Sequence, residues 1–434
     1  MAFAFTTTES SRWQNSAVTE TKEQKCDLSI GFEKQEFWGY GVSFNELGKL
    51  ALDKIDDKTK TELFDNLFKN DFQFDFCRLP IGANDYAFDW YSYNETDGDF
   101  EMKNFSIERD KTILIPYLKE ALKRNPKIKL FASPWSPPTW MKTPKVYNWG
   151  KINPDPKNLD AYALYFVKYI QAYKKEGINI NQLHFQNEIY ADQKFPSCLW
   201  ETKEIATFIH KHLAPAFKKH DIESEIWLGT LNGTINETGW PECYTDFEKM
   251  AFPLLINDTE QNIKGISYQW DGKHAITQTT ESFPHIPTIQ SENECGNGTN
   301  TWKYAKYIFG LVHHYLKAGV RAYCYWNMIL PTKNGLSTWG WKQNCLVSIE
   351  DNIVYNNEYF LFKHLSKFVG AGSIFLDTSG PFSSMSVCFK NAEGQIVTVI
   401  KNPLETDKEI AVSSMNKQYK LTLKADSFTT MVID

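Results

Sequence analysis

Eight short apolar segments with β-strand character recur between residues 38 and 327, and most are followed by a segment whose apolar residues have helical spacing. The strand-like segments are 38–44, 74–81, 128–133, 182–188, 225–231, 263–270, 288–292 and 321–327. The helical pattern occurs in 58–69, 108–124, 158–176, 202–220 and 301–318. Strands that alternate with helices in this way predict a parallel sheet joined by crossover helices.

Eight such units favour an α/β fold of the closed (β/α)8 TIM-barrel type over an open, doubly wound sheet. The first strand-like segment is not followed by the Gly-x-Gly-x-x-Gly turn of a dinucleotide-binding sheet. In a barrel, the C-terminal ends of the strands carry the chemistry. These ends are rich in polar and aromatic residues here, so we expect any functional site at that rim.

Beyond residue 372 the pattern changes to short runs of alternating polar and apolar residues, separated by turn residues. These runs are 386–389, 395–401, 409–413, 419–423 and 429–433. They predict a small antiparallel β domain, and the alternating residues 26–30 are a candidate for further strands of it. We therefore expect a barrel over 31–370 and a side β-sandwich domain formed by 1–30 together with 371–434.

The composition narrows the possible partners. A formal net charge of -6 provides no basic surface for nucleic acid, and no apolar run approaches the roughly 18 residues that span a bilayer. The eight cysteines include no Cys-x-x-Cys pair, so neither a metal site nor a small disulfide scaffold is indicated. Aromatic residues reach 15%, and rings in loops suit stacking on sugars as well as packing.

The N-terminal residues lack a basic region followed by a long apolar core, so the chain as given has no signal peptide. A cytoplasmic protein is consistent with this observation. A secreted or periplasmic protein whose leader has been removed is equally consistent with it.

Two of the strand-like segments end in glutamate, one at Asn187-Glu188 and the other at Ser291-Glu292. A buried strand offers no favourable environment for an unpaired carboxylate. Two such residues at one barrel rim predict a carboxylate pair that performs acid and base chemistry on a glycoside, without metal or cofactor. We expect Glu188 to be the acid/base and Glu292 the nucleophile of a retaining enzyme.

Two other interpretations of these glutamates remain open. Each one could be an ion-paired residue at a strand end, although two of them in an aromatic rim favour catalysis. Glu294 is the rival nucleophile, but it lies two residues beyond the expected strand end and would share a face with Glu292 only if the strand continued.

Several stretches of the chain are similar to those of a known family. They are Arg78-Leu79-Pro80, the run from Ala132-Ser133-Pro134-Trp135 to Thr143, Gln186-Asn187-Glu188, Ser291-Glu292 and Trp326-Asn327. From about residue 37 to the C-terminus, the chain resembles glycoside hydrolase family 30, a clan A family that includes lysosomal glucosylceramidases and bacterial β-1,6-glucanases and xylanases. The long Ala-Ser-Pro-Trp run is highly specific.

The resemblance implies a retaining β-glycosidase with Glu188 as acid/base and Glu292 as nucleophile, on a barrel with a side β-sandwich made from both chain ends. It implies that Arg78 lies near Glu292 and keeps it ionised, with a buried structural salt bridge as a compatible role. The positions that match those holding the innermost sugar are Asp85, Trp135, Asn187, Trp326 and Asn327.

The chain also departs from the glucosylceramidases. Where these carry His-Trp-Tyr after the sixth strand, it reads Gln269-Trp270-Asp271, so the tyrosine near the nucleophile is missing and Gln269 and Trp270 are expected to contact substrate. We expect a carbohydrate substrate with β-linked glucose, β-1,6-glucan or its oligosaccharides first. The alternatives are a β-xylosidase, a β-fucosidase, a glucosylceramidase-like exo-glycosidase and, outside enzymes, a catalytically silent carbohydrate-binding barrel.

Overall fold

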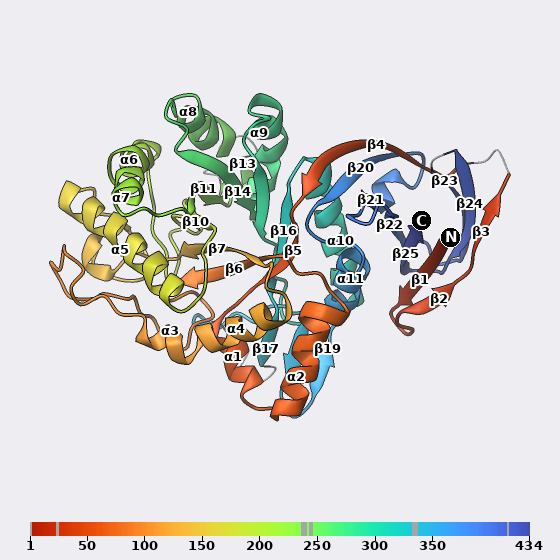
Figure 1. Ribbon diagram of the computed structural model, residues 1–434, viewed down its shortest axis with the longest axis horizontal. Coiled ribbons are helices and arrows are strands. Elements are labelled where there is room, and N and C mark those ends of the chain that lie inside the picture. Colours follow the sequence, from red (N-terminus) through yellow and green to blue (C-terminus); the bar gives the residue numbers. More distant parts are fainter. Residues whose placement is uncertain (1, 23–25, 236–240, 243–245, 332–336, 415) are drawn as a thin grey trace.

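The computed structural model describes residues 2–22, 26–235, 241–242, 246–331, 337–414 and 416–434. A barrel surrounded by helices lies beside a β-sheet unit that contains both chain termini (Figure 1). Among the described residues, no helix has the length and apolarity to span a membrane. The seven described cysteines are free thiols, and Cys243 lies outside the described residues.

Eight parallel strands close into a barrel in the order β10-β11-β14-β15-β16-β5-β6-β7. They are β5 (Gly39–Ser43), β6 (Phe76–Ile81), β7 (Lys129–Pro134), β10 (Gln182–His184), β11 (Glu225–Leu231), β14 (Ile263–Gln269), β15 (Thr288–Glu292) and β16 (Ala322–Asn327). Each overlaps one of the eight predicted segments, so the predicted TIM barrel is confirmed.

The lower part of the barrel interior is filled by side chains. Phe76, Phe131 and Trp227 form one fully buried cluster there, and the His184 ring stacks on Trp227 at 5.2 Å between centroids. Because this layer closes the barrel axis, a ligand can reach the interior only from the C-terminal end of the strands.

Helices surround the barrel. The predicted helical segments correspond to α2 (Asp57–Asp65) with η1 (Asn66–Asn70), α3 (Glu108–Thr112) with α4 (Leu114–Arg124), α5 (Pro156–Lys175), α6 (Thr202–Thr207) with η3 (Phe208–Leu213) and α7 (Ala214–Lys219), and α10 (Trp302–Lys317). The remaining helices, which the apolar pattern did not predict, are α1 (Glu46–Leu52), η2 (Thr139–Met141), η4 (Asp246–Ala251), α8 (Phe252–Leu255), η5 (Trp270–Ala275), α9 (Ile276–Ser282) and α11 (Asn357–Ser366). Most of them are too short to display a helical period.

Short strands stabilise the loops. They are β8 (Lys142–Thr143) with β9 (Lys151–Ile152), β12 (Thr234–Ile235) with β13 (Pro241–Glu242), and β17 (Ile329–Pro331) with β18 (Val347–Ile349) and β19 (Ile353–Tyr355). The last three form a small sheet directly after β16.

The second unit is a ten-stranded sheet in the order β2-β1-β25-β22-β21-β20-β4-β23-β24-β3. Its strands are β1 (Ala2–Thr8), β2 (Gln14–Ser16), β3 (Val18–Thr21), β4 (Leu28–Phe37), β20 (Ser373–Ser379), β21 (Ser386–Lys390, preceded by η6, Ser383–Met385), β22 (Ile396–Asn402), β23 (Lys408–Ser414), β24 (Lys417–Leu423) and β25 (Ser427–Ile433). Residues from across the sheet enclose a common core, as in a sandwich built from both chain ends.

β4 joins the two units. It runs through residue 31, where the sequence pattern placed the start of the barrel, and continues to Phe37 in the sandwich. Only Trp38 separates it from β5, the first barrel strand. The return connection lies beside it, because the Gly372 N–H donates to the Phe37 carbonyl at 3.0 Å.

The sandwich strands nearest the barrel are buried on both faces. In β21, Cys388 faces the sandwich core while Val387 and Phe389 belong to the core shared with the barrel. In β25, Met431 faces the sandwich core, whereas Phe428 packs against Trp302 and Phe309 of α10 at 4.9 and 5.7 Å between ring centroids. Because successive side chains of a strand point to opposite faces, each of these strands contributes to both cores.

Replacement of Phe428 by alanine should lower the free energy of unfolding by about 3–5 kcal/mol, because a fully buried ring is lost between β25 and α10. Denaturant titration followed by tryptophan fluorescence measures this. Phe32→Ala is the matched control, since the Phe32 side chain is 85% exposed and its loss should change stability by about 0.5 kcal/mol or less. Equal effects of the two changes would contradict the packing described.

Candidate active site

Glu188 and Glu292 lie together at the C-terminal end of the barrel. Gln269 Nε2 donates to Glu188 Oε1 at 3.2 Å and to Glu292 Oε2 at 3.3 Å. These two oxygens are therefore within about 6.5 Å of each other, the sum of the two distances. Gln269 Oε1 accepts from Ser291 Oγ at 2.9 Å, which directs the NH2 group of the amide toward the carboxylates.

Strand β10 ends four residues earlier than the sequence pattern indicates. The predicted strand reaches Glu188, but β10 stops at His184. Glu188 itself has a φ of 49°, which no strand residue adopts. Its N–H donates instead to Thr230 Oγ1 at 2.9 Å, and the Asn187 N–H donates to the Pro134 carbonyl at 2.8 Å. These bonds turn the chain so that Glu188 faces Gln269.

Arg78 connects the two halves of this arrangement. Its Nη1 donates to Glu292 Oε2 at 2.7 Å, and its Nη2 donates to Asn187 Oδ1 at 2.7 Å. The guanidinium also donates to Ser133 Oγ and lies 4.6 Å from the centroid of the Trp135 ring. Arg78 is completely buried, so its charge depends on Glu292 for compensation.

Trp270 provides a second hydrogen bond to Glu292. Its Nε1 donates to Glu292 Oε1 at 3.2 Å, while Arg78 occupies the other oxygen. Trp270 has a φ of 48°, which ends β14 at Gln269 rather than at the predicted residue 270. Non-glycine residues in the left-handed region cost energy and are concentrated at functional sites, and both Glu188 and Trp270 belong to this class.

The electrostatic environment differs between the two glutamates. Burial raises the pKa of Glu188 to about 8, and the charge of Glu292 adds to the effect. Burial also raises the pKa of Glu292, but the Arg78 charge and the hydrogen bonds from Trp270, Arg78 and Gln269 oppose that rise. Glu188 is thus the carboxyl that retains a proton near neutral pH, and Glu292 is the one with cationic support.

A small pocket opens above the two carboxylates. The predicted site residues among its lining are Asp85, Trp135, Asn187, Glu188, Trp270 and Glu292. Burial raises the pKa of Asp85 to about 8. Asp85 Oδ1 and Trp339 Nε1 are buried at this pocket, and Trp339 lies close enough to the Asp85 carboxyl to oppose this rise in its pKa, although the two atoms do not form a hydrogen bond of normal geometry.

Four predicted site residues lie behind this lining. Arg78 and Gln269 contact the glutamates from below, as described. Trp326 packs on Trp135 at 5.4 Å between ring centroids. Asn327 is fully buried and donates to Gln343 Oε1 at 2.7 Å, so it reaches the pocket only through Gln343, which lines it.

A loop after β17 covers one side of the pocket. Its residues Trp339, Trp341 and Gln343 line the site, together with Phe195 from the loop after Glu188. The loop is held in place because the Thr338 N–H donates to the Asp85 carbonyl at 2.7 Å. Phe195 and Gln343 carried no sequence signal, since neither belongs to a motif or a periodic segment.

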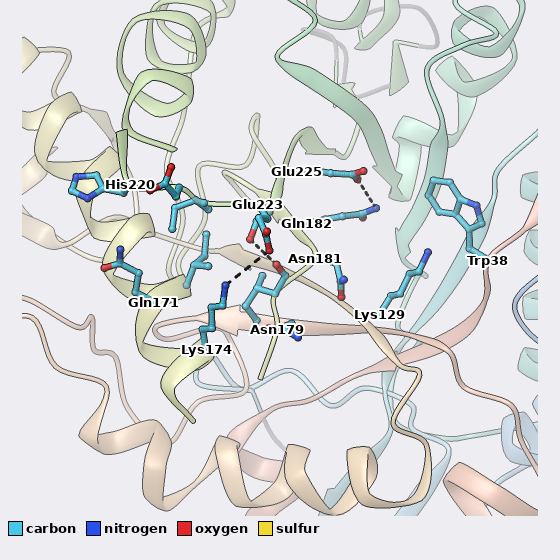
Figure 2. Close-up of a pocket in the computed structure, with 15 residues that line it drawn as sticks. Trp38, Lys129, Gln171, Lys174, Asn179, Asn181, Gln182, His220, Glu223 and Glu225 are labelled. Carbon is cyan, nitrogen blue, oxygen red and sulfur yellow. Dashed lines mark hydrogen bonds and ion pairs between the residues drawn. The ribbon is translucent and has the colours of Figure 1, made fainter. Parts of the chain in front are cut away.

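Glu294, the rival nucleophile, forms an ion pair with Lys273 at 2.9 Å and is absent from the described residues that line the pocket. Among the residues with assigned positions, no group of three or more His, Cys, Asp or Glu side chains could hold a metal ion. A larger hollow, shown in Figure 2, lies at the opposite end of the barrel, beside the starts of β7, β10 and β11. It contains neither Glu188 nor Glu292.

The coupling between the carboxyls predicts that Glu292→Gln lowers the pKa of Glu188 from about 8, because loss of a neighbouring negative charge favours the ionised form. Carbon-13 NMR of carboxyl-labelled glutamate measures this, with the signal assigned by its loss in Glu188→Gln. Glu108→Gln, on an exposed helix, should leave the pKa of Glu188 unchanged. An unaltered Glu188 titration in Glu292→Gln would rule out the proximity described.

Curated relatives cover nearly all of the chain. An endo-1,6-β-D-glucanase of Trichoderma harzianum is 26% identical over 94% of this chain and 86% of that protein. The lysosomal acid glucosylceramidase of Mus musculus is 25% identical over 87% of this chain and 77% of that protein.

Solved structures share the fold. SrfJ from Salmonella typhimurium has a TM-score of 0.87 and 22% identity, with 100% of this chain and 99% of that chain covered. An endo-β-1,6-glucanase has a TM-score of 0.85 and 24% identity, with 99% of each chain covered.

Two family models together match most of the chain. The one described as the glycosyl hydrolase family 30 TIM-barrel domain matches residues 37–369. The one described as the glycosyl hydrolase family 30 beta sandwich domain matches residues 370–431. The protein is therefore a member of glycoside hydrolase family 30.

Proposed function

We propose that this glycoside hydrolase is a retaining β-glycosidase that acts on β-linked glucosides, with β-1,6-glucan or its oligosaccharides as the main substrate. Glu188 is the acid/base and Glu292 is the nucleophile. The observation that carries the proposal is the Gln269 amide, which donates to both carboxylates and so holds them at one reaction centre.

The separation of the carboxyls supports retention of configuration. Retaining enzymes place the two groups about 5–5.5 Å apart, whereas inverting enzymes need about 6.5–9.5 Å to admit a water molecule. The upper limit of about 6.5 Å between the two bridged oxygens lies at the lower edge of the inverting range, so it favours direct attack by one carboxylate.

The mechanism then has two steps. Glu292 attacks the anomeric carbon and forms a glycosyl ester, while Glu188 donates its proton to the leaving glycosidic oxygen. In the second step Glu188 removes a proton from water, which attacks the same carbon and releases Glu292 as a carboxylate. The raised pKa of Glu188 keeps it protonated for its role as acid in the first step. After that step it has given up its proton and can act as base in the second.

The choice of β-1,6-glucan is supported by the endo-1,6-β-D-glucanases among the relatives and by the aromatic lining of the pocket. Phe195, Trp339 and Trp341 line the pocket beside the carboxylates, and aromatic rings can pack against the apolar surfaces of sugar rings. A β-xylosidase or a β-fucosidase would hold a different sugar in the same pocket, whereas a glucosylceramidase-like exo-glycosidase would hold glucose with a different leaving group.

Azide should distinguish the roles of the two glutamates. Glu292→Ala should show no turnover of an aryl β-glucoside, and azide should restore it with the α-glucosyl azide as product, since azide occupies the place of the nucleophile. Glu188→Ala should lose about 10²–10⁴-fold in activity and yield the β-glucosyl azide. NMR of the products identifies the anomers.

The same anomer from both alanine variants would contradict the assignment. Glu294→Ala serves as the control for the rival nucleophile: it should give no azide product, because Glu294 is bound to Lys273 outside the pocket lining.

A panel of oligosaccharides tests the substrate. We expect hydrolysis of β-1,6-linked gluco-oligosaccharides, with the β-anomer formed first, and little hydrolysis of β-1,4-xylo-oligosaccharides or β-fucosides. Chromatography sizes the products, and NMR during the reaction follows their configuration. Binding without hydrolysis would support a carbohydrate-binding barrel instead, and the Glu292→Gln protein provides the inactive reference.

A further inference from the structure

Lys273 occupies a position that catalysis as described does not explain. It lies in η5, three residues after Trp270, and its Nζ donates to the Trp270 carbonyl at 3.0 Å, to Asp271 Oδ1 at 3.1 Å and to Glu294 Oε1 at 2.9 Å. An ammonium group has three protons, and all three are used. Both side chains of the Lys273–Glu294 pair are mostly buried, with 15% and 11% exposed.

The Trp270 carbonyl is the informative acceptor of the three. Trp270 holds a left-handed backbone conformation, and such a conformation persists only when surrounding contacts enforce it. The hydrogen bond from Lys273 is such a contact. It fixes the peptide that follows Trp270, and thereby the direction from which the indole reaches Glu292 Oε1.

Both members of the ion pair are anchored to α10. The Tyr304 hydroxyl donates to the Glu294 carbonyl at 2.7 Å, and His314 Nε2 lies 3.2 Å from the Lys273 carbonyl. The ion pair therefore links the loops after β14 and β15 to one long helix. This arrangement explains a mostly buried carboxylate at residue 294 without assigning it a chemical step.

We propose that Lys273 and Glu294 are positioning residues, which hold the Trp270 indole against the nucleophile Glu292. The inference rests on the proposed function of Glu292. The pair keeps one N–H donor directed at Glu292 Oε1 while Arg78 holds Oε2, so both oxygens are oriented before substrate binds. Where glucosylceramidases have a tyrosine near the nucleophile, this chain has Asp271. The indole of the preceding residue, Trp270, is held by the Lys273–Glu294 ion pair.

Other titratable or charged groups also lie around Glu292 and Lys273. Around Glu292 they are Arg78 on β6, Asp85 after β6, Glu188 after β10 and the thiol of Cys295 after β15. Around Lys273 they are Asp271, His274, Glu294, Tyr307 and His314. Of these groups, the variants below change only Glu294 or Lys273 itself, so a shift common to both variants reports the pair.

The test compares Lys273→Met and Glu294→Gln with Trp270→Phe, which lacks the N–H. Loss of a hydrogen bond to Glu292 raises the pKa of its carboxyl. The acidic limb of kcat/KM for an aryl β-glucoside should therefore move to higher pH in all three variants, with kcat lowered about tenfold and KM changed little. Lys264→Met is the control, because Lys264 is the one exposed residue of β14, and this variant should behave as the unmodified protein.

Combined variants decide between positioning and general stabilisation. If the pair acts through the indole, Lys273→Met added to Trp270→Phe should change the acidic limb no further, because the N–H is already absent. Additive shifts, or an unaltered acidic limb in both single variants, would overturn the proposal. Thermal unfolding of each variant monitors the fold, and Glu294→Gln provides the same comparison if Lys273→Met does not fold.

Failure of this inference differs from failure of the proposed function. Hydrolysis by the unmodified protein that is lost in Glu292→Gln supports the function, whatever the behaviour of Lys273 and Glu294. An active Glu292→Gln protein would remove the basis of both.

Discussion

A completely buried guanidinium is the contact on which the upper layer of the barrel depends. Arg78 comes from β6 and reaches Ser133 on β7, Asn187 after β10 and Glu292 on β15, so one side chain connects four parts of the ring. Burial of a lone charge costs several kcal/mol, and the carboxylate of Glu292 compensates for it. The aromatic rings of Trp135 and Trp326 exclude water from the pair, which strengthens it further.

This network also constrains the rest of the site. Asn187 Oδ1 accepts from Arg78 at 2.7 Å, from Thr230 Oγ1 at 3.2 Å and from Gln269 Nε2 at 3.3 Å, so its orientation is determined by three elements. Its amide nitrogen is thereby left for the pocket that Asn187 lines. The residue before Glu188 and the residue before Trp270 thus belong to one connected set of hydrogen bonds.

The barrel could be predicted because its strands are buried on both faces and several stand out as apolar runs, as 128–133 and 225–231 do. The two glutamates could be predicted because a carboxylate at the end of such a run is unusual. The left-handed conformations at Glu188 and Trp270 could not be predicted. The one at Glu188 depends on a contact with Thr230, which is distant in sequence. The one at Trp270 depends on a hydrogen bond from Lys273 within η5, which is too short to show a helical pattern. Phe195 and Gln343 depend on how two irregular loops fold over the site, which no periodicity encodes.

The crossing between the two units has a consequence for how the protein can move. A single residue, Trp38, separates the last sandwich strand from the first barrel strand, and the returning chain is hydrogen-bonded to Phe37 just beside it. There is no length of tether over which the sandwich could swing, so it cannot deliver polysaccharide to the barrel as a mobile module would. Exchange of the sandwich between enzymes would require cutting the chain next to the paired strand β4. A barrel moved into another protein would therefore have to be transferred together with β4 and β20.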